Sequence, residues 1–148
     1  MSNDADLMKL YSQRILALAA DLSHTDRLTD PDASCKKRSP LCGSTVTVDL
    51  LLDGDQVTGY AQDVKACALG QAAASVVGRE VVGLDRATIT KGRDQLLAML
   101  KAGGPVPDAP FAGLEVLEPA RDYKNRHASI MLAFEATLGA FDDVKISS

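Results

Sequence analysis

Apolar positions change from a helical to an alternating spacing along the chain, and this change predicts an α+β fold. One stripe of a helix over residues 5–22 carries Leu7, Tyr11, Ile15, Leu18 and Leu22. A polar connection over 24–41 follows. From Val46 to Leu52 apolar and polar residues then alternate, as in a half-buried strand. After the turn Asp53-Gly54-Asp55, a weaker return strand is expected over 56–65, completing a hairpin.

The second half of the chain has the spacing of helices. A short helix is expected over 68–77, ended by Gly78, and a longer one from the N-cap Asp85 to Lys101. A connector over 103–108 leads to a last helix over 123–141. The inward positions of the two longer helices are Ile89, Leu96, Leu97, Leu100, Ile130, Phe134, Leu138 and Phe141. We therefore expect one α+β domain over 1–148: a small antiparallel sheet of about three strands, with an N-terminal helix and several C-terminal helices packed on it.

Composition narrows the classes of function. The chain has 148 residues, of which 46% are hydrophobic and 24% charged, as in ordinary globular proteins. A net charge of −4 and a pI near 5.1 argue against nucleic-acid binding, as does an aromatic content of 4% without Trp. No apolar stretch is long enough to span a bilayer. An acidic, polar start and three cysteines indicate reduced thiols and a cytoplasmic protein.

Two of the cysteines, Cys42 and Cys67, lie equally far on either side of the predicted hairpin turn. Directly opposed residues in an antiparallel pair are about 4.5–5.5 Å apart, close enough to share a metal ion or cluster. A bulge near Gly59 would shift this pairing by one residue. Cys67 also directly precedes a predicted helix, whose N-terminus stabilises a thiolate. The alternative is that each cysteine is a small buried apolar residue.

Two segments around these cysteines resemble the U-type iron–sulfur scaffold family (NifU, IscU, SufU). They are Ser39-Pro40-Leu41-Cys42-Gly43-Ser44 and Ala66-Cys67-Ala68-Leu69-Gly70-Gln71-Ala72-Ala73-Ala74-Ser75. The family carries an x-P-x-C-G-D segment and, about two dozen residues later, a G-C-x-x-x-x-A-S-x-S segment. The resemblance covers about 7–142, and the region 80–120 is most similar to the SufU branch. It implies an N-terminal helix, a small antiparallel sheet and then helices.

The resemblance also implies a ligand set and partners. Family members hold a nascent [2Fe–2S] cluster, or zinc in SufU-type proteins, with three cysteines and an aspartate. They receive sulfur from a cysteine desulfurase and pass sulfur or cluster to acceptor proteins. Cys42 and Cys67 match the first two cysteines, and Ser44 stands at the aspartate position. The third cysteine is replaced by Ala128 in an IscU-type alignment of the last helix, or by Ser129 in a SufU-type alignment.

Other residues are candidates to complete the site. His127 is an imidazole ligand in one interpretation and a helix-start histidine bonded to backbone or water in the other. Cys35 is a third thiol if its loop folds back, and otherwise an incidental loop cysteine; Ser44 and Ser129 are weaker ligands.

Three functions remain open. The first is a non-enzymatic scaffold that binds iron, a [2Fe–2S] cluster or zinc. The second is a metal-free adaptor of a desulfurase or scaffold, and the third is a thiol sulfur carrier. The expected partners are a cysteine desulfurase and downstream iron–sulfur acceptor proteins.

Overall fold

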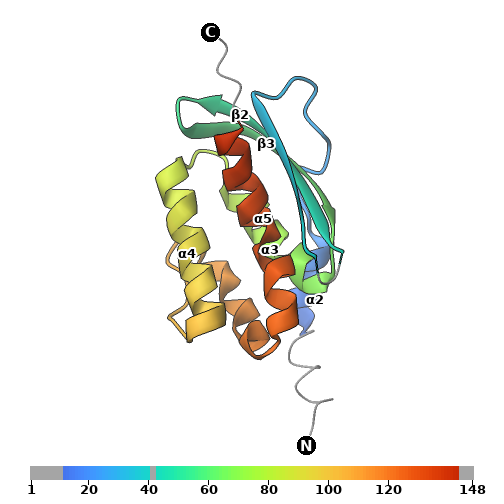
Figure 1. The fold of residues 1–148 in the computed structure, drawn as a ribbon, viewed down its shortest axis with the longest axis vertical. Coiled ribbons are helices and arrows are strands. Elements are labelled where there is room, and N and C mark those ends of the chain that lie inside the picture. The colour runs from blue at the N-terminus through green and yellow to red at the C-terminus, as the bar shows by residue number, and fades with distance from the viewer. Residues whose placement is uncertain (1–11, 41–42, 144–148) are drawn as a thin grey trace, which may run out of the picture.

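The computed structural model describes residues 12–40 and 43–143, and it has the expected α+β architecture. A three-stranded antiparallel sheet is followed by helices that cover one of its faces (Figure 1). The elements, in chain order, are α2 (Gln13–Ala20), β1 (Ala33–Arg38), β2 (Thr45–Asp53), β3 (Gln56–Lys65), α3 (Ala68–Glu80), α4 (Arg86–Ala102), the 3₁₀ helix η1 (Ala112–Asp122) and α5 (Lys124–Asp142). No helix within the described ranges is long and apolar enough to cross a membrane.

The strand β1 corrects the expectation of a polar connection over 24–41. It pairs antiparallel with β2 and forms an edge of the sheet, in the order β1-β2-β3. Its side chains change from buried Ala33 and half-buried Cys35 to exposed Lys36, Lys37 and Arg38. Charged residues on an edge strand discourage pairing with another chain. Because they stand where apolar residues would alternate, the sequence pattern does not predict this strand.

The hairpin of β2 and β3 contains a bulge, which changes the predicted opposition of the two cysteines. The register shifts between Leu51 and Leu52, so that Leu51 pairs with Gly59 and Thr45 pairs with Lys65. Continued to the open end, this register puts Gly43 rather than Cys42 in line with Cys67. Cys42 itself lies outside the described residues, and its separation from Cys67 stays a prediction.

Helix α3 continues through Gly78, where the sequence predicts its end. Gly78 is buried and faces the Gln62 side chain, whose Nε2 would lie 2.5 Å from a Cβ added at that glycine. Gln62 Nε2 donates to the carbonyl of Ala74 at 3.1 Å and to that of Ser23 at 3.2 Å. The glycine therefore allows α3 to approach β3 closely instead of ending the helix.

The other predicted helices are confirmed where the structure describes them. Asp85 caps α4 by accepting a hydrogen bond from Thr88 N at 2.9 Å. Ile89, Leu96 and Leu100 of α4 are buried, as are Ile130, Phe134 and Phe141 of α5. Of the helix expected over 5–22, residues 13–20 form α2, and its earlier residues lie outside the described ranges. The 3₁₀ helix η1 was not predicted.

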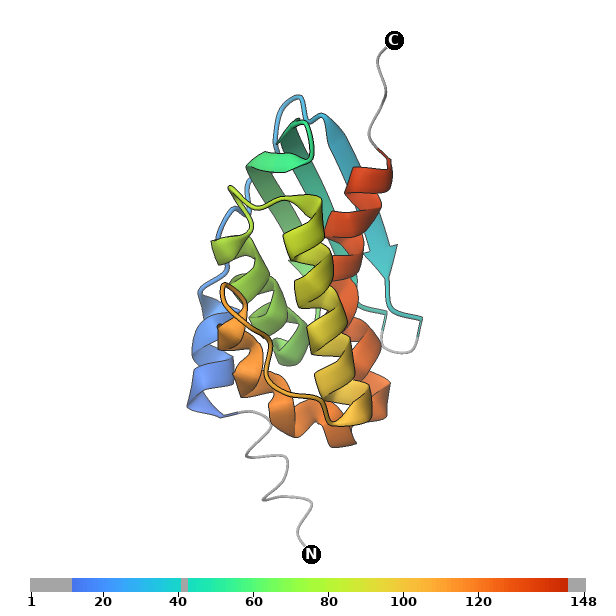
Figure 2. The same cartoon turned by 90° about the vertical axis from the view of Figure 1, so that its left-hand side faces the viewer.

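The helices form two layers on one face of the sheet. Helix α5 packs on β1 and β2 and α3 packs on β3, while α4 packs on α5 from outside (Figures 1 and 2). The core of the protein lies between the sheet and these helices. The first turn of α3 and the second turn of α5 meet at the end of the sheet where β2 begins and β3 ends, and this end holds the candidate site.

Candidate functional site

Cys67 lies where the chain leaves β3 and enters α3. It is the N-cap residue of α3, with an extended backbone (φ −66°, ψ 170°), and its carbonyl accepts the N–H of Gln71 at 2.9 Å. The thiol is half-buried. The free N–H groups of a first helical turn favour negative charge, so this position is suited to a thiolate.

Two serines from other elements meet this thiol. Ser129 of α5 has its Oγ 3.5 Å from Cys67 Sγ, and it donates a hydrogen bond to Ser44 Oγ at 3.1 Å. Ser44 immediately precedes β2, and both serines are buried, at 5% and 1% exposure for Ser44 and Ser129. The structure thus brings Cys67 together with two of the weaker candidates from the sequence.

The surroundings of Cys67 lower the pKa of its thiol. Burial, the largest influence, raises this pKa, but hydrogen bonds to the sulfur outweigh it. The Ser129 hydroxyl contributes most to the lowering. The backbone N–H groups of Gly70 and Leu69 and the side chain of Arg126 lower the pKa further. Cys67 is therefore a nucleophilic thiolate, or a soft ligand, more readily than an unperturbed cysteine is.

Gly70 makes this arrangement sterically feasible. A Cβ added at Gly70 would lie 2.7 Å from Ser129 Oγ and 2.9 Å from the Ala66 Cβ. Any larger residue would push the first turn of α3 away from α5. The sequence contains Gly70 within the motif, but only the packing of the two helices reveals what it does.

His127 lies on a different side of α5. Its Nε2 is 3.0 Å from the carbonyl oxygen of Ala120 and 3.1 Å from that of Arg121, at the end of η1. Two residues along a helix correspond to a rotation of about 200°, so His127 and Ser129 face in nearly opposite directions. The structure therefore favours the interpretation of His127 as a histidine bonded to backbone. Ser129, which the SufU-type alignment puts at the third cysteine, is an α5 residue that contacts Cys67.

Cys35 is also separate from Cys67. It lies on β1 beside Gly139, where a Cβ added to the glycine would be 2.6 Å from Cys35 Sγ. Ser129 and Gly139 are about 15 Å apart along α5. Burial raises the pKa of the Cys35 thiol, which Lys37 only partly opposes. Cys35 is thus a strand residue packed under α5 and is not brought to the site.

The described residues contain no group of three His, Cys, Asp or Glu side chains that could hold a metal ion. Cys42 is outside this statement because it is not among them. Residues on either side of Cys42 are joined by backbone hydrogen bonds: Ser39 N donates to Ser44 O at 2.8 Å, and Gly43 N donates to Ser39 O at 3.0 Å. The loop that carries Cys42 therefore begins and ends next to Ser44.

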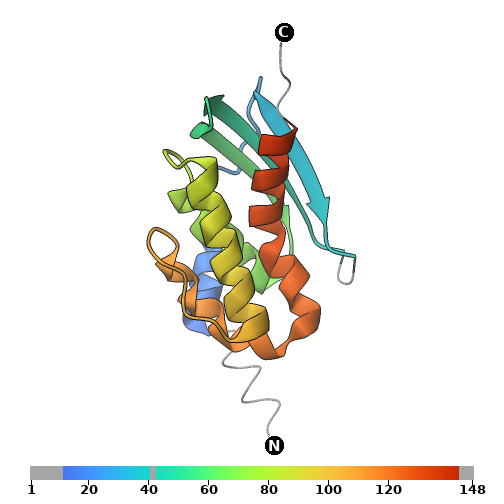
Figure 3. The ribbon, with the colours of Figure 1, turned by 60° about the vertical axis from the view of Figure 1, so that its left-hand side comes forward.

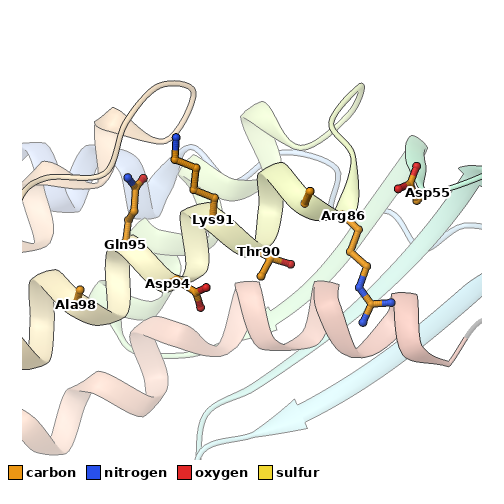
Figure 4. Close-up of a pocket in the computed structure, with 8 residues that line it drawn as sticks. Asp55, Arg86, Thr90, Lys91, Asp94, Gln95 and Ala98 are labelled. Carbon is orange, nitrogen blue, oxygen red and sulfur yellow. The ribbon is translucent and has the colours of Figure 1, made fainter.

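An open hollow of about 690 Å³ lies elsewhere, along α4 (Figure 4). Polar side chains of α4 line it, and Arg86 reaches from it toward α5, where it pairs with Asp142 and lies over the Phe141 ring. Its lining includes no cysteine, histidine or buried polar side chain, and we assign it no chemistry.

Solved structures similar to this chain share its fold over nearly its whole length. A nitrogen-fixing NifU-like protein (N-terminal) from Brucella abortus is 41% identical, with a TM-score of 0.92, covering 97% of this chain and 99% of that one. A protein described as an iron–sulfur cluster assembly scaffold for the SUF system, from Fervidobacterium islandicum AW-1, is 18% identical, with a TM-score of 0.79 and coverages of 93% and 98%.

A third structure, of a hypothetical protein, is 18% identical, with a TM-score of 0.75, covering 91% of this chain and 98% of that one. Comparisons with protein-family models and with curated proteins give no match. The two structures at 18% identity support the fold alone.

Proposed function

This chain belongs to the NifU-like, U-type family of iron–sulfur scaffolds, and from this premise we propose that it carries iron–sulfur cargo during cluster assembly. One observation supports the proposal most directly. Ser44 and Cys67, at two positions that the family resemblance assigns to ligands, meet Ser129, which the SufU-type alignment puts at the third cysteine, although the three come from separate parts of the chain.

The ligands that this chain offers differ from the three cysteines and one aspartate that the family resemblance implies. Cys67 and Cys42 are the thiol ligands that the chain offers to iron or to a [2Fe–2S] cluster, while the hydroxyls of Ser44 and Ser129 are poor ligands for soft metals. A resident zinc ion needs about four nitrogen, sulfur or carboxylate ligands, and the described side chains do not fit one. We therefore treat iron and sulfide as cargo held by two thiols of this chain, with the remaining ligands supplied from outside it.

The lowered pKa of Cys67 also supports a part in receiving sulfur. The Cys67 thiolate would attack the terminal sulfur of a persulfide on a cysteine desulfurase. A new S–S bond then forms at Cys67, the S–S bond of the desulfurase breaks, and the desulfurase cysteine leaves as a thiolate. The protein is in this proposal a carrier and scaffold without turnover of its own. Its place is the cytoplasm, where thiols stay reduced, and its partners are the desulfurase and iron–sulfur acceptor proteins.

Anaerobic reconstitution with ferric iron and sulfide tests the proposal. We expect the wild-type protein to gain visible charge-transfer absorption and bound iron, and Cys67→Ser and Cys42→Ser each to lose them. Cys35→Ser is the matched control, since Cys35 is a half-buried thiol away from Ser129, and this variant should bind iron as the wild type does.

A metal-free adaptor is the second candidate function, favoured by the serines at two ligand positions. Wild-type protein that stays folded by circular dichroism but takes up no iron would refute the scaffold and support the adaptor. Iron uptake that persists equally in Cys67→Ser would place the cargo elsewhere.

A further inference from the structure

A groove beside the candidate site formed by Ser44, Cys67 and Ser129 combines an apolar floor with a rim of positive charge. Helix α5 forms its floor, and α4 and the end of β1 form its walls; Figure 3 shows α5 between these two elements. The hollow has a volume of about 430 Å³. Its apolar lining consists of Leu97, Ala128, Met131 and Leu132.

The rim of this groove carries four cations from three elements. They are Lys37, Arg38, Lys101 and Lys124, all of them exposed. A smaller hollow of about 250 Å³ continues the groove past Lys101 and Lys124 and adds Arg121. The carboxylate that lines the groove, Glu135, is held by Arg93 at 2.9 Å.

These cations are available to a partner. Within the described part of the chain, none of the five forms a salt bridge, whereas most arginines elsewhere do. The protein as a whole has a net charge of −4, so the concentration of positive charge here is local and not a property of the whole surface. Local fields of this kind steer oppositely charged partners toward a binding site.

We propose that this groove binds an acidic, amphipathic segment of a partner protein, with apolar side chains on α5 and carboxylates against the lysines and arginines. A groove with an apolar floor suits an amphipathic helix. A nucleic acid is disfavoured because the lining has no Phe, Tyr or Trp on which bases could stack. A small anion is disfavoured because apolar side chains line the groove together with the cations.

The position of the groove connects its occupant to the candidate site. Ala128 of the floor directly precedes Ser129, and Ser39 of the wall donates its N–H to Ser44 O at 2.8 Å. A bound segment would therefore lie against the base of the loop that carries Cys42. The partner would therefore lie next to the site that we propose for iron and sulfide, but its binding requires neither iron nor sulfide.

The test uses metal-free protein, so that its result is independent of iron uptake. A fluorescein-labelled 16-residue helical peptide, with Leu spaced along one face and Glu elsewhere, is titrated by fluorescence anisotropy. We expect saturable binding that weakens with added salt. Lys101→Glu combined with Lys124→Glu should weaken it about tenfold or more, since two attractions become repulsions. Lys36→Glu combined with Lys65→Glu is the matched control. These lysines are exposed, do not line the groove and, like the test pair, form no salt bridge among the described residues, so the variant changes the net charge equally and should leave the affinity within about twofold.

Three results would overturn the proposal. The first is equal weakening by both pairs of substitutions, which would mean that only overall charge matters. The second is undiminished binding of a peptide in which Ser replaces every Leu, which would remove the role of the apolar floor. The third is displacement of the peptide by micromolar inorganic pyrophosphate, which would identify a small-anion site.

Discussion

Ser129 is the residue that contacts both Ser44 and Cys67 in the candidate site. Each serine hydroxyl has one proton to donate, and Ser129 Oγ lies between Ser44 Oγ and Cys67 Sγ. When Cys67 is a thiolate, Ser129 can donate its proton to the sulfur instead of to Ser44. Ser129 can thus stabilise negative charge on Cys67, but neither serine supplies the soft ligand that a thiol would.

Replacing Ser129 by cysteine should therefore restore a metal site. Two thiolates on one tetrahedral zinc ion are about 3.8 Å apart, and Ser129 Oγ is already 3.5 Å from Cys67 Sγ. We expect Ser129→Cys to bind zinc about tenfold or more tightly than the wild type, measured by competition with a chromophoric chelator at pH 7.

Ala128→Cys is the control for this gain. It adds the same thiol one residue earlier, where the IscU-type alignment would put it, but on the side of α5 that lines the groove. It should not tighten zinc binding. A larger gain in zinc affinity from Ala128→Cys than from Ser129→Cys would contradict the contact between Ser129 and Cys67.

The sequence indicates candidate residue types for the site but cannot orient their side chains. Ala128 and Ser129 both remained open as replacements of the missing thiol, because two alignments differ by one residue. One residue on a helix is a rotation of about 100°, and only the packing of α5 on α3 decides which side chain faces Cys67. His127 was favoured on its ligand chemistry, and the carbonyl groups of η1 that bind it belong to an element that was not predicted.

At the scale of elements, a buried carboxylate attaches a loop to the outer face of the sheet. Asp49 of β2 is fully buried and accepts hydrogen bonds from Arg27 at 2.6 and 2.8 Å, from Ser34 at 2.7 Å and from Leu28 N at 3.1 Å. Burial raises the pKa of this carboxyl, but the hydrogen bonds from Arg27, Ser34 and Leu28 outweigh burial and hold the pKa below its usual value. Asp49 thus joins three segments of the chain.

Asp49→Asn should make the protein less stable at neutral pH and less sensitive to acid. The folded-state pKa of Asp49 is depressed, so its contribution is fully present above the unfolded-state pKa and is lost as the pH falls through the folded-state value. We expect a loss of about 2 kcal/mol in the free energy of unfolding at pH 7, measured in urea, and a smaller loss near pH 3.

The control for this prediction is Asp53→Asn, at the exposed end of the same strand, which should change the unfolding free energy by less than about 0.5 kcal/mol. An Asp49→Asn variant that is as stable as the wild type at pH 7 would mean that the loop is held by other contacts.

The strands also show what periodicity can and cannot predict. The sequence predicts strand β2 because Val46, Val48 and Leu50 alternate with polar residues. In the structure all three are buried. Strand β1 was missed because it is an edge strand ending in Lys36, Lys37 and Arg38. The bulge at Leu51 and Leu52 moved the register by one, which a count of residues from the turn cannot detect.

At the scale of the whole molecule, the helices on one face of the sheet gather the functional features at one end. The second turn of α5 contributes Ser129 to the candidate site and Ala128 to the groove. The first turn of α3 contributes Cys67, and the end of β1 contributes the basic wall. A single end of the domain can therefore serve both cargo and partner, which suits a carrier that must release what it holds.

The number of thiols that one chain brings to this end limits how it can hold a cluster. A [2Fe–2S] cluster is normally held by four thiolates, and this chain offers Cys42 and Cys67, whereas Cys35 packs away from Ser129. In the absence of added thiols, we expect anaerobic reconstitution to give one cluster for two chains, with the second copy completing the coordination. Native mass spectrometry should then show a dimer carrying two iron and two sulfide ions, and metal-free protein should remain a monomer under the same conditions. A monomer holding a complete cluster would instead mean that Ser44 and Ser129, or residues outside the described ranges, act as ligands, and Ser129→Ala would separate these two explanations by its effect on iron retention.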